Sequence, residues 1–377
     1  MTNGTGEEQD ISLLLVTRDL SDGSLGRAYC LWLIARELGW KTTVVSLLGD
    51  SVWAPLAHTR FARECHRAGD EEEMALLARQ SSLIIAVKPL PDSFGVAVRV
   101  ADRTGVPLLL DIDDPDLEFV LGWHPFRLAL GLRLFRRDLY RSFQQMAALA
   151  PQYVSMSSNP SLAARHDSLL MPHVRQDPGP AETVSAHTVA FVGTPRRHKG
   201  VTVLRHAIES IPPDLRPTLI ITAPAPDDAH PWEQWIGVTS LDQGLDIVRT
   251  ASVIAIPSLD SQYAEGQLPV KLIDAMMSGK SIVASDLPPI RWALDGDRCG
   301  TLVRPGDTTA LAHAIIDALE NPHAADKAHE ARTRALQLFT PSAQADSFDR
   351  ICRLAMNRSA AAPTGQPPTI ASDAQRT

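Results

Sequence analysis

Short apolar runs alternate with segments of helical periodicity along most of the chain. The first run, 11–17, precedes a segment in which apolar side chains recur every three or four residues, as on one face of a helix. Uninterrupted apolar strands that alternate with helices are typical of a parallel, doubly wound sheet. The other runs lie at 42–48, 82–87 and 107–112, and then at 188–193, 218–222, 253–257, 281–285 and 300–305.

A break in this alternation divides the chain. Residues 173–188 are rich in Pro, Gly and small polar side chains, as linkers are. We therefore predict an α/β fold with two Rossmann-like, doubly wound domains, 1–175 and 186–340, that face each other across a cleft. Residues 341–357 are predicted to form a helix that packs back on the first domain. Residues 358–377 contain one Ile and no other large apolar side chain, which predicts disorder.

Net charge, cysteine spacing and the length of the apolar runs argue against several classes of function. The net charge of -8 argues against nucleic acid as the main partner. The four cysteines lie far apart, without zinc-ligand spacing. The first ten residues are polar and acidic, unlike a signal peptide, and no apolar run reaches the length of a membrane span. These features predict a cytoplasmic location.

One segment leaves membrane contact open. Residues 124–146 combine an apolar stripe at helical spacing with a cluster of arginines. Such a helix can pack its stripe into the core, receive a phosphorylated acceptor, or lie peripherally on the inner face of a membrane.

The loop after the run at 188–193 is the first candidate site, because ligands of open α/β sheets bind beyond the strand ends. It contains Arg196, Arg197, His198 and Lys199 next to a predicted helix N-terminus. Helix N-termini and such cations favour a phosphate group. A diphosphate is the predicted ligand, and a solvated basic turn is the alternative.

A second candidate site begins at the loop before a predicted helix. Pro269 suits the first turn of a helix, and Lys271 and Asp274 then share one face. A carboxylate at this place can accept both hydroxyls of a ribose, while the lysine offsets phosphate charge. The alternative is an ordinary solvent-facing Lys–Asp pair.

The first domain offers two more loops. Gly23 lies in the loop 19–27 after the first strand, where a glycine allows close approach of a ligand. Asp111, Asp113 and Asp114 cluster at the end of another strand. Clustered carboxylates can bind a cation or sugar hydroxyls, can raise the pKa of one member, or can simply cap the strand end.

Two of these segments carry a family resemblance. GTPRRHKG (193–200) and EGQLPVKLIDAMMSGKSIVASD (265–286) resemble the donor-binding core of GT-B glycosyltransferases in the GT4-like, group 1 family. The resemblance is specific over about 188–322 and is one of fold pattern over 1–175. Lys199 matches the lysine of the family's Gly-Arg-x-x-x-x-Lys-Gly pattern, whereas Thr194 stands at its arginine position.

The resemblance implies retaining transfer of a sugar from a UDP- or GDP-linked donor to an acceptor hydroxyl on a polysaccharide, glycolipid or natural product. It implies no cofactor and no metal, although an Asp-x-Asp metal motif of the GT-A kind is an alternative interpretation of 111–113. A nucleotide-sugar epimerase of the same fold and a non-catalytic nucleotide-sugar-binding protein stay open. The implied catalytic residues are Lys199, Asp113 and Arg196, with Arg196 or Arg197 in place of the missing arginine; the donor-binding residues are Gly23, Arg197, Glu265, Gly266, Gln267, Leu268, Lys271 and Asp274; the acceptor-binding residues are Asp111 and Asp114.

Overall fold

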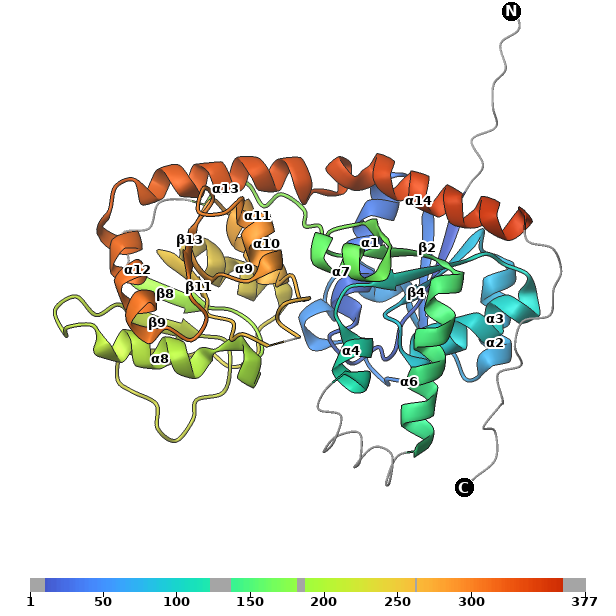
Figure 1. The fold of residues 1–377 in the computed structure, drawn as a ribbon, viewed down its shortest axis with the longest axis horizontal. Coiled ribbons are helices and arrows are strands. Elements are labelled where there is room, and N and C mark those ends of the chain that lie inside the picture. The colour runs from blue at the N-terminus through green and yellow to red at the C-terminus, as the bar shows by residue number, and fades with distance from the viewer. Residues whose placement is uncertain (1–10, 123–136, 182–186, 262, 362–377) are drawn as a thin grey trace, which may run out of the picture.

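The computed structural model of the protein describes residues 11–122, 137–181, 187–261 and 263–361. It contains two parallel sheets, one in each half of the chain (Figure 1). The first runs β3-β2-β1-β4-β5-β6-β7 and consists of β1 (Ser12–Val16), β2 (Lys41–Ser46), β3 (Cys65–Arg67), β4 (Leu83–Val87), β5 (Leu108–Ile112), β6 (Val154–Ser157) and β7 (Leu169–Leu170). The second runs β10-β9-β8-β11-β12-β13 and consists of β8 (Thr188–Phe191), β9 (Thr218–Ile221), β10 (Glu233–Trp235), β11 (Val253–Ile256), β12 (Ser281–Ser285) and β13 (Thr301–Val303).

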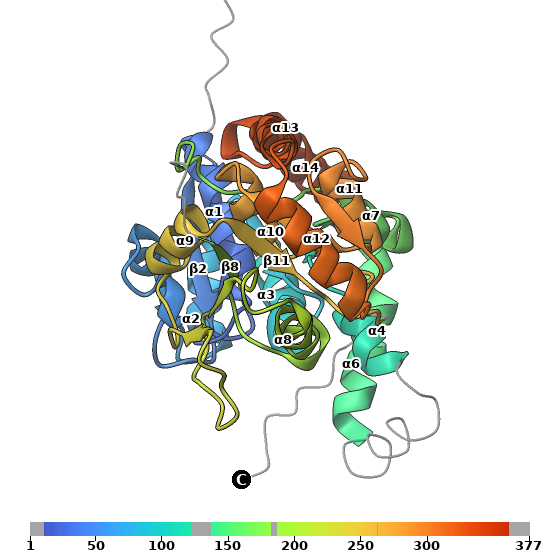
Figure 2. The ribbon, with the colours of Figure 1, turned by 90° about the vertical axis from the view of Figure 1, so that its left-hand side faces the viewer.

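Helices cover both faces of each sheet, as the doubly wound prediction requires. On the first sheet, one face carries α1 (Leu25–Glu37) and α14 (Pro341–Ala361), and the other carries α2 (Glu71–Arg79), α3 (Val96–Thr104), α4 (Asp116–Leu121) and α6 (Arg137–Leu149). On the second sheet, α8 (Val201–Ser210) and α12 (Thr308–Glu320) lie opposite α9 (Leu241–Thr250), α10 (Val270–Met277), α11 (Pro288–Leu294) and α13 (Ala324–Leu338), as Figure 2 shows from the side of this domain. The remaining helix, α7 (Pro160–His166), precedes β7.

The buried strands explain the apolar runs of the sequence. Every residue of β4 and β11 is buried, because helices pack on both faces of these central strands. The sequence did not indicate the short strands β3, β6, β7 and β10. They are two to four residues long and lie toward the sheet edges, where sequences such as CHR and EQW form no apolar run.

The strand orders place the ligand-binding edge of each sheet. In the first sheet β2 and β3 lie on one side of β1, whereas β4 and the later strands lie on its other side. The second sheet has the same change of side between β8 and β11. Open α/β sheets bind ligands at the carboxyl ends of the strands at such switch points. The loops that follow β1, β4, β5, β8 and β11 are therefore the ones that can build a site.

The chain crosses between the domains twice. The first crossing follows β7, and its initial part is packed rather than free, because His173 and Val174 are buried. The segment predicted to be a linker thus begins with residues that are packed against the first domain. The second crossing joins α13 to α14, which together run along both domains at the top of Figure 1. Phe348 and Cys352 of α14 are fully buried in the core of the first domain.

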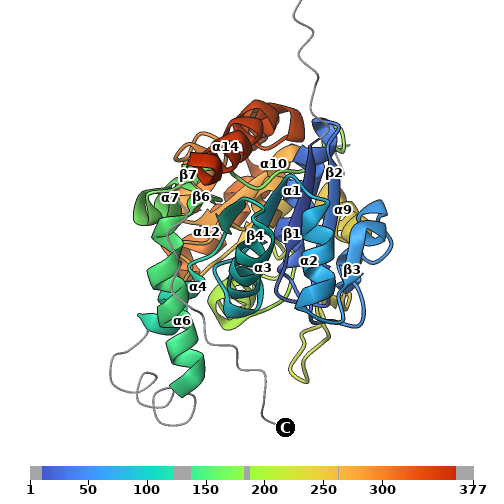
Figure 3. The same cartoon turned by 90° about the vertical axis from the view of Figure 1, so that its right-hand side faces the viewer.

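Two predicted segments fall partly outside the described residues. For the basic segment 124–146 the structure describes only the part in α6, which projects from the first domain (Figure 3). There Phe143 and Met146 are buried, whereas Leu139 is exposed. Helix α14 continues to Ala361, four residues into the tail predicted to be disordered, and 362–377 lie outside the description. Of the helices described, none has the length and apolar character needed to span a bilayer.

Candidate active site

A cavity of about 500 Å³ lies between the two domains, where the carboxyl ends of both sheets face each other. This volume is in the range of small-molecule sites. The residues that line it include Gly23, Arg27, Tyr29, Trp53, Lys88, Asp113, Asp114 and Asp116 of the first domain, His173 and Arg175 of the first crossing, and Gly193, Arg196, His198, Lys199, Thr222, Tyr263, Gln267, Leu268, Lys271 and Asp274 of the second domain.

Two glycines shape the basic loop after β8 in different ways. Gly193 (φ 118°) donates its N–H to the Thr222 hydroxyl at 2.7 Å and lines the cavity. Gly200 (φ 71°) does not face a ligand: a Cβ atom there would lie 1.8 Å from the Pro257 carbonyl oxygen. Gly193 therefore allows close approach of a ligand, while Gly200 lets the loop pack against the end of β11.

The basic side chains of this loop differ in whether they reach the cavity. Arg196 lines the cavity, whereas Arg197 is exposed and lies outside the lining. Burial lowers the pKa of His198 to about 4, with the charges of Lys199 and Arg196 adding to the effect. His198 is therefore neutral near pH 7 and supplies no positive charge, and its ring packs 5.2 Å from that of Tyr263.

Two buried ammonium groups face the cavity from the second domain. Lys199 donates to the side-chain oxygen of Gln267, and burial lowers its pKa to about 8. The Lys271 Nζ lies 3.3 Å from the centroid of the Phe191 ring, and burial together with Lys199 holds its pKa well below the usual value. Neither forms an ion pair with a carboxylate in the described part of the chain. Asp114 attracts Lys199 from a longer distance, and cations in such surroundings without an ion-pair partner are stabilised by a bound anion.

The first turn of α10 adds to this wall. Gln267, Leu268 and Lys271 line the cavity, and the first N–H groups of a helix lack intrahelical acceptors. Asp274, one turn further along, also lines the cavity and accepts a 2.8 Å hydrogen bond from the Nε of Arg175. Phosphate-compatible amides, cations and a carboxylate are thus brought together along a single helix face.

The loop before α10 departs from the sequence expectation at two residues. Glu265 is exposed and does not line the cavity. The Gly266 N–H donates to the Tyr263 carbonyl at 3.2 Å, and the Gly266 carbonyl accepts from Asn159 Nδ2 at 2.8 Å. A Cβ atom at Gly266 would lie 3.0 Å from Pro115 of the first domain. Direct donor contacts by Glu265 and by the Gly266 amide are therefore wrong for this structure, since this glycine serves the approach of the two domains.

A lysine organises the acidic cluster on the opposite wall. Lys88 follows β4 with a positive φ of 74°, and its Nζ lies 2.9 Å from Asp113, 2.7 Å from Asp114 and 3.0 Å from Asp116. Carboxylate oxygens of these three aspartates lie within 4.8 Å of one another, but the ammonium group already occupies the space between them. Gln267 also donates to Asp114 at 2.8 Å, which links the two walls.

The carboxyls of this cluster titrate differently. Burial raises the pKa of Asp113 to about 7, because its desolvation outweighs the attraction of Lys88. For Asp114, burial acts in the same direction, but the charge and hydrogen bond of Lys88 and the hydrogen bond from Gln267 hold its pKa below the usual value. Burial raises the pKa of Asp116 as well, so Asp113 and Asp116 are the members of the cluster that are easier to protonate, and Asp114 stays ionised.

Asp111 does not belong to this cluster, and the expectation that it binds an acceptor is wrong. It is fully buried, and Arg27 Nε lies 3.1 Å from both of its carboxylate oxygens. Strand β5 ends at Ile112, so strand alternation does not extend to Asp113. The two aspartates therefore serve different regions, with Asp111 turned toward α1 and Asp113 in the cavity.

With this geometry in place, residues 186–321 match the family model of Glycosyl transferases group 1. The protein has the GT-B fold, and its second domain is a group 1 glycosyltransferase domain. Phosphatidyl-myo-inositol mannosyltransferase of Mycobacterium leprae is 30% identical over 104 residues, a stretch that covers 28% of this chain and 27% of that protein. The aligned stretch thus spans about a quarter of the mannosyltransferase.

Solved structures resemble the fold over most of the chain. Anabaena Alr3699/HepE in complex with UDP-glucose has a TM-score of 0.70 at 14% identity, covering 90% of this chain and 98% of that one. The sucrose-phosphate synthase of Thermosynechococcus elongatus has a TM-score of 0.67 at 15% identity, covering 92% and 100%. At these identities the likeness establishes the two-domain fold.

Several charged residues of the GT-B cavity could not be assigned from the sequence, among them Lys88, Arg27 and Arg175. Lys88 directly follows an apolar run, the position where ligand-binding side chains of such sheets lie, so this signal was available. Arg27 stands at the start of a helical pattern and Arg175 in the apparent linker, where a charge is ordinarily solvated. Their burial beside Asp111 and Asp274 becomes visible only when distant segments are brought together.

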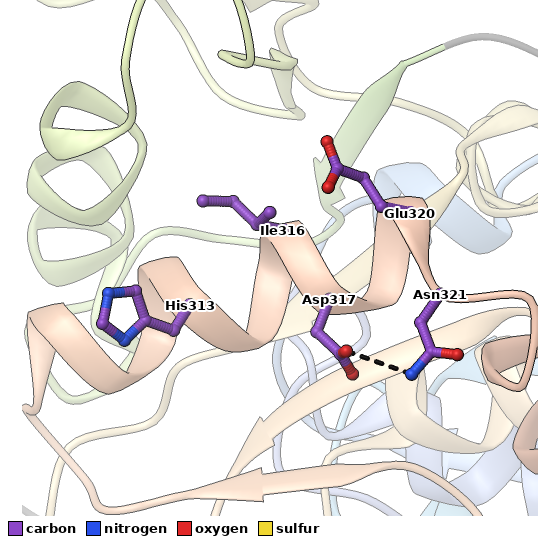
Figure 4. A pocket seen from close by; sticks show the side chains of 5 residues that line it. All are labelled: His313, Ile316, Asp317, Glu320 and Asn321. Carbon is purple, nitrogen blue, oxygen red and sulfur yellow. Dashed lines mark hydrogen bonds between the residues drawn. The ribbon is translucent and has the colours of Figure 1, made fainter.

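A second hollow, of about 350 Å³, lies on the outer surface of α12, and the side chains that line it do not point toward a common centre. Asp317 and Asn321 point to one side of the helix and hydrogen-bond to each other at 3.1 Å, whereas Glu320 points to the other side (Figure 4). Because its side chains do not converge, the interdomain cavity is the place where chemistry can be built.

Proposed function

We propose that this protein transfers a sugar, with retention of anomeric configuration, from a UDP- or GDP-linked donor to an acceptor hydroxyl. The observation that carries the proposal is the pair of buried ammonium groups, Lys199 and Lys271, which face the interdomain cavity without a carboxylate partner in an ion pair. A diphosphate supplies the missing negative charge. The group 1 domain and the likeness to a protein solved with UDP-glucose support the same donor class.

In the proposed orientation the donor lies along the second-domain wall. Its diphosphate lies against Lys199, Lys271 and Arg196, close to the first turn of α10, and its ribose lies against Asp274. Preorganised cations in a site from which water is largely excluded stabilise the charge that develops on the departing diphosphate. They need no reorganisation at the moment of reaction.

The acceptor approaches from the first domain. Its hydroxyl attacks the anomeric carbon from the side that the diphosphate leaves, the new C–O bond forms as the old one breaks, and the hydroxyl proton passes to a phosphate oxygen. Asp113 accepts a hydrogen bond from a neighbouring hydroxyl of the acceptor and so orients the attacking one, and Asp114 contacts the acceptor beside it. No covalent sugar–protein intermediate is part of this route.

The proposal includes transfer without a metal ion. Lys88 neutralises part of the charge of Asp113, Asp114 and Asp116 from the position that a cation bridging them would take. The lysines of the opposite wall provide the charge that a divalent ion supplies to the diphosphate in metal-dependent enzymes.

Calorimetric binding of UDP, GDP, ADP and dTDP tests the donor site. We expect UDP or GDP to bind selectively, and Lys199→Ala and Asp274→Ala each to weaken binding about 10- to 100-fold, the value of a hydrogen bond to a charged group. Arg197→Ala is the matched control and should bind as the wild type does, because this cation lies outside the cavity. Failure of all four nucleotides to bind the wild type would refute the proposal.

Slow donor hydrolysis tests the stereochemistry. With an α-linked UDP or GDP sugar as donor, NMR should detect the α-anomer as the first product. First release of the β-anomer would rule out retention and leave the donor site itself standing.

A further inference from the structure

Arg175 joins the second domain to the first at the floor of the cavity. Its Nε donates to Asp274 Oδ1 at 2.8 Å, and its Nη1 lies 3.3 Å from the Cys30 Sγ of α1. The centre of the guanidinium group lies 5.8 Å from the centroid of the Tyr29 ring, also on α1. One side chain of the first crossing is thus held by both domains.

The ion pair leaves polar atoms available to a ligand. Asp274 Oδ1 accepts from Arg175, whereas no described residue donates to Oδ2. Both side chains line the cavity, and both are largely buried, with 13% and 19% of their surfaces exposed. The carboxylate therefore has one oxygen fixed by the protein and one free to accept from hydroxyl groups.

Asp274 depends on this partner for its charge. Burial raises the pKa of the carboxyl, and the charge and hydrogen bond of Arg175 counter that rise. The other charged side chain on the same face of α10 is Lys271, one turn away, whose own pKa is held low by burial. Without Arg175 the carboxyl becomes easier to protonate and loses the contact that fixes its rotamer.

We propose that Arg175 is a positioning residue of the donor site, which keeps Asp274 ionised and oriented so that its free oxygen receives the ribose hydroxyls. This inference rests on the proposed donor and adds to it a residue from the interdomain connection. Because α1 holds the same guanidinium group, the proposed recognition of the ribose uses contacts from both domains.

The test compares the affinities of UDP and 2′,3′-dideoxy-UDP between pH 5.5 and 8 by calorimetry. The ratio of the two dissociation constants isolates the ribose hydroxyls and cancels the titration of the phosphate. The variants are Arg175→Met, Arg175→Lys and Asp274→Asn. Arg249→Met is the matched control, because Arg249 contacts the same crossing at the carbonyls of Pro178 and Gly179 and lies outside the cavity.

In the wild type and in Arg249→Met, UDP should bind about tenfold or more tightly than the dideoxy analogue. Arg175→Met and Asp274→Asn should lose most of this preference, and Arg175→Lys should keep part of it because the charge remains. What preference is left in Arg175→Met should decline at a higher pH than in the wild type, since its carboxyl protonates more readily.

An unchanged ratio and pH profile in Arg175→Met would overturn the inference while the donor site stands. Loss of the preference to the same extent in Arg249→Met would also overturn it, by showing a general effect on the crossing. If the wild type binds neither UDP nor its dideoxy analogue, the same comparison is made with GDP and 2′,3′-dideoxy-GDP, and failure of both pairs to bind refutes the proposed function and the inference with it. Poor folding of Arg175→Met does not mask the result, because Arg175→Lys and the affinity ratio report on folded protein.

Discussion

Binding of a nucleoside diphosphate should draw a proton from solution, and Lys199 should be its main destination. In the free protein, burial lowers the pKa of this ammonium group to about 8, so about half of the side chains are neutral at pH 8. A diphosphate beside Nζ favours the charged form and returns the pKa toward or above its ordinary value. The affinity should therefore be full below pH 8 and should fall as the pH rises through that value.

The expected uptake follows from this pKa. With a midpoint of about 8, binding should take up about 0.1 proton at pH 7, about 0.5 at pH 8 and about 0.9 at pH 9. Lys271 acts in the same direction, because burial and Lys199 lower its pKa as well. These values are the share of Lys199 alone, and the proton that the nucleotide phosphate itself releases on binding is subtracted from the total near pH 7.

Calorimetry of UDP binding in two buffers of different ionisation enthalpy measures the uptake. Lys199→Arg is the decisive variant, because an arginine keeps its charge at every pH used and should bind UDP without its share of the proton uptake. Lys199→Met should lose both the uptake and about 10- to 100-fold in affinity. Equal uptake by the wild type and Lys199→Arg at pH 8 would refute the assignment of the proton to this residue.

Three further predictions concern the frame of the site. Gly200→Ala should lower the free energy of unfolding by several kcal/mol in urea titrations, because its Cβ would overlap the Pro257 carbonyl. Gly306→Ala, at a similar φ with open space around it, should lower it by only about 1–2 kcal/mol, and equal losses would contradict the packing argument. Arg27→Met should cost about 3–5 kcal/mol by leaving Asp111 as an uncompensated buried charge, and the double variant Arg27→Met/Asp111→Leu should recover part of this cost, so that additive losses would argue against a coupled pair. Sugar transfer should persist after EDTA treatment and dialysis, and loss of activity restored by a divalent ion would end the metal-independent mechanism.

The sequence predicts the architecture because the central strands carry their own signal. β1, β4 and β11 are buried on both faces and therefore read as unbroken apolar runs, and the two sets of runs predict two sheets. The basic loop and the helix with Lys271 and Asp274 are similarly local, since each lies between a strand and a helix that periodicity identifies.

What the sequence could not show is which of these groups meet. Asp111 and Asp113 are two residues apart, yet one faces Arg27 and the other the cavity, because the strand ends between them. Gly266 has the composition of a ligand loop, but its lack of a side chain serves the contact with Pro115. Partners that lie about 100 residues apart, such as Arg175 and Asp274, leave no local pattern.

The return of α14 to the first domain makes that domain discontinuous in the chain. Phe348 and Cys352 are part of its core, although the whole second domain is synthesised before them. During synthesis the second domain can complete its core first, and the first domain must wait for the last helix. A fragment that ends at the first crossing therefore lacks the part of its core that α14 supplies, and an isolated first domain requires α14 to be fused back to it.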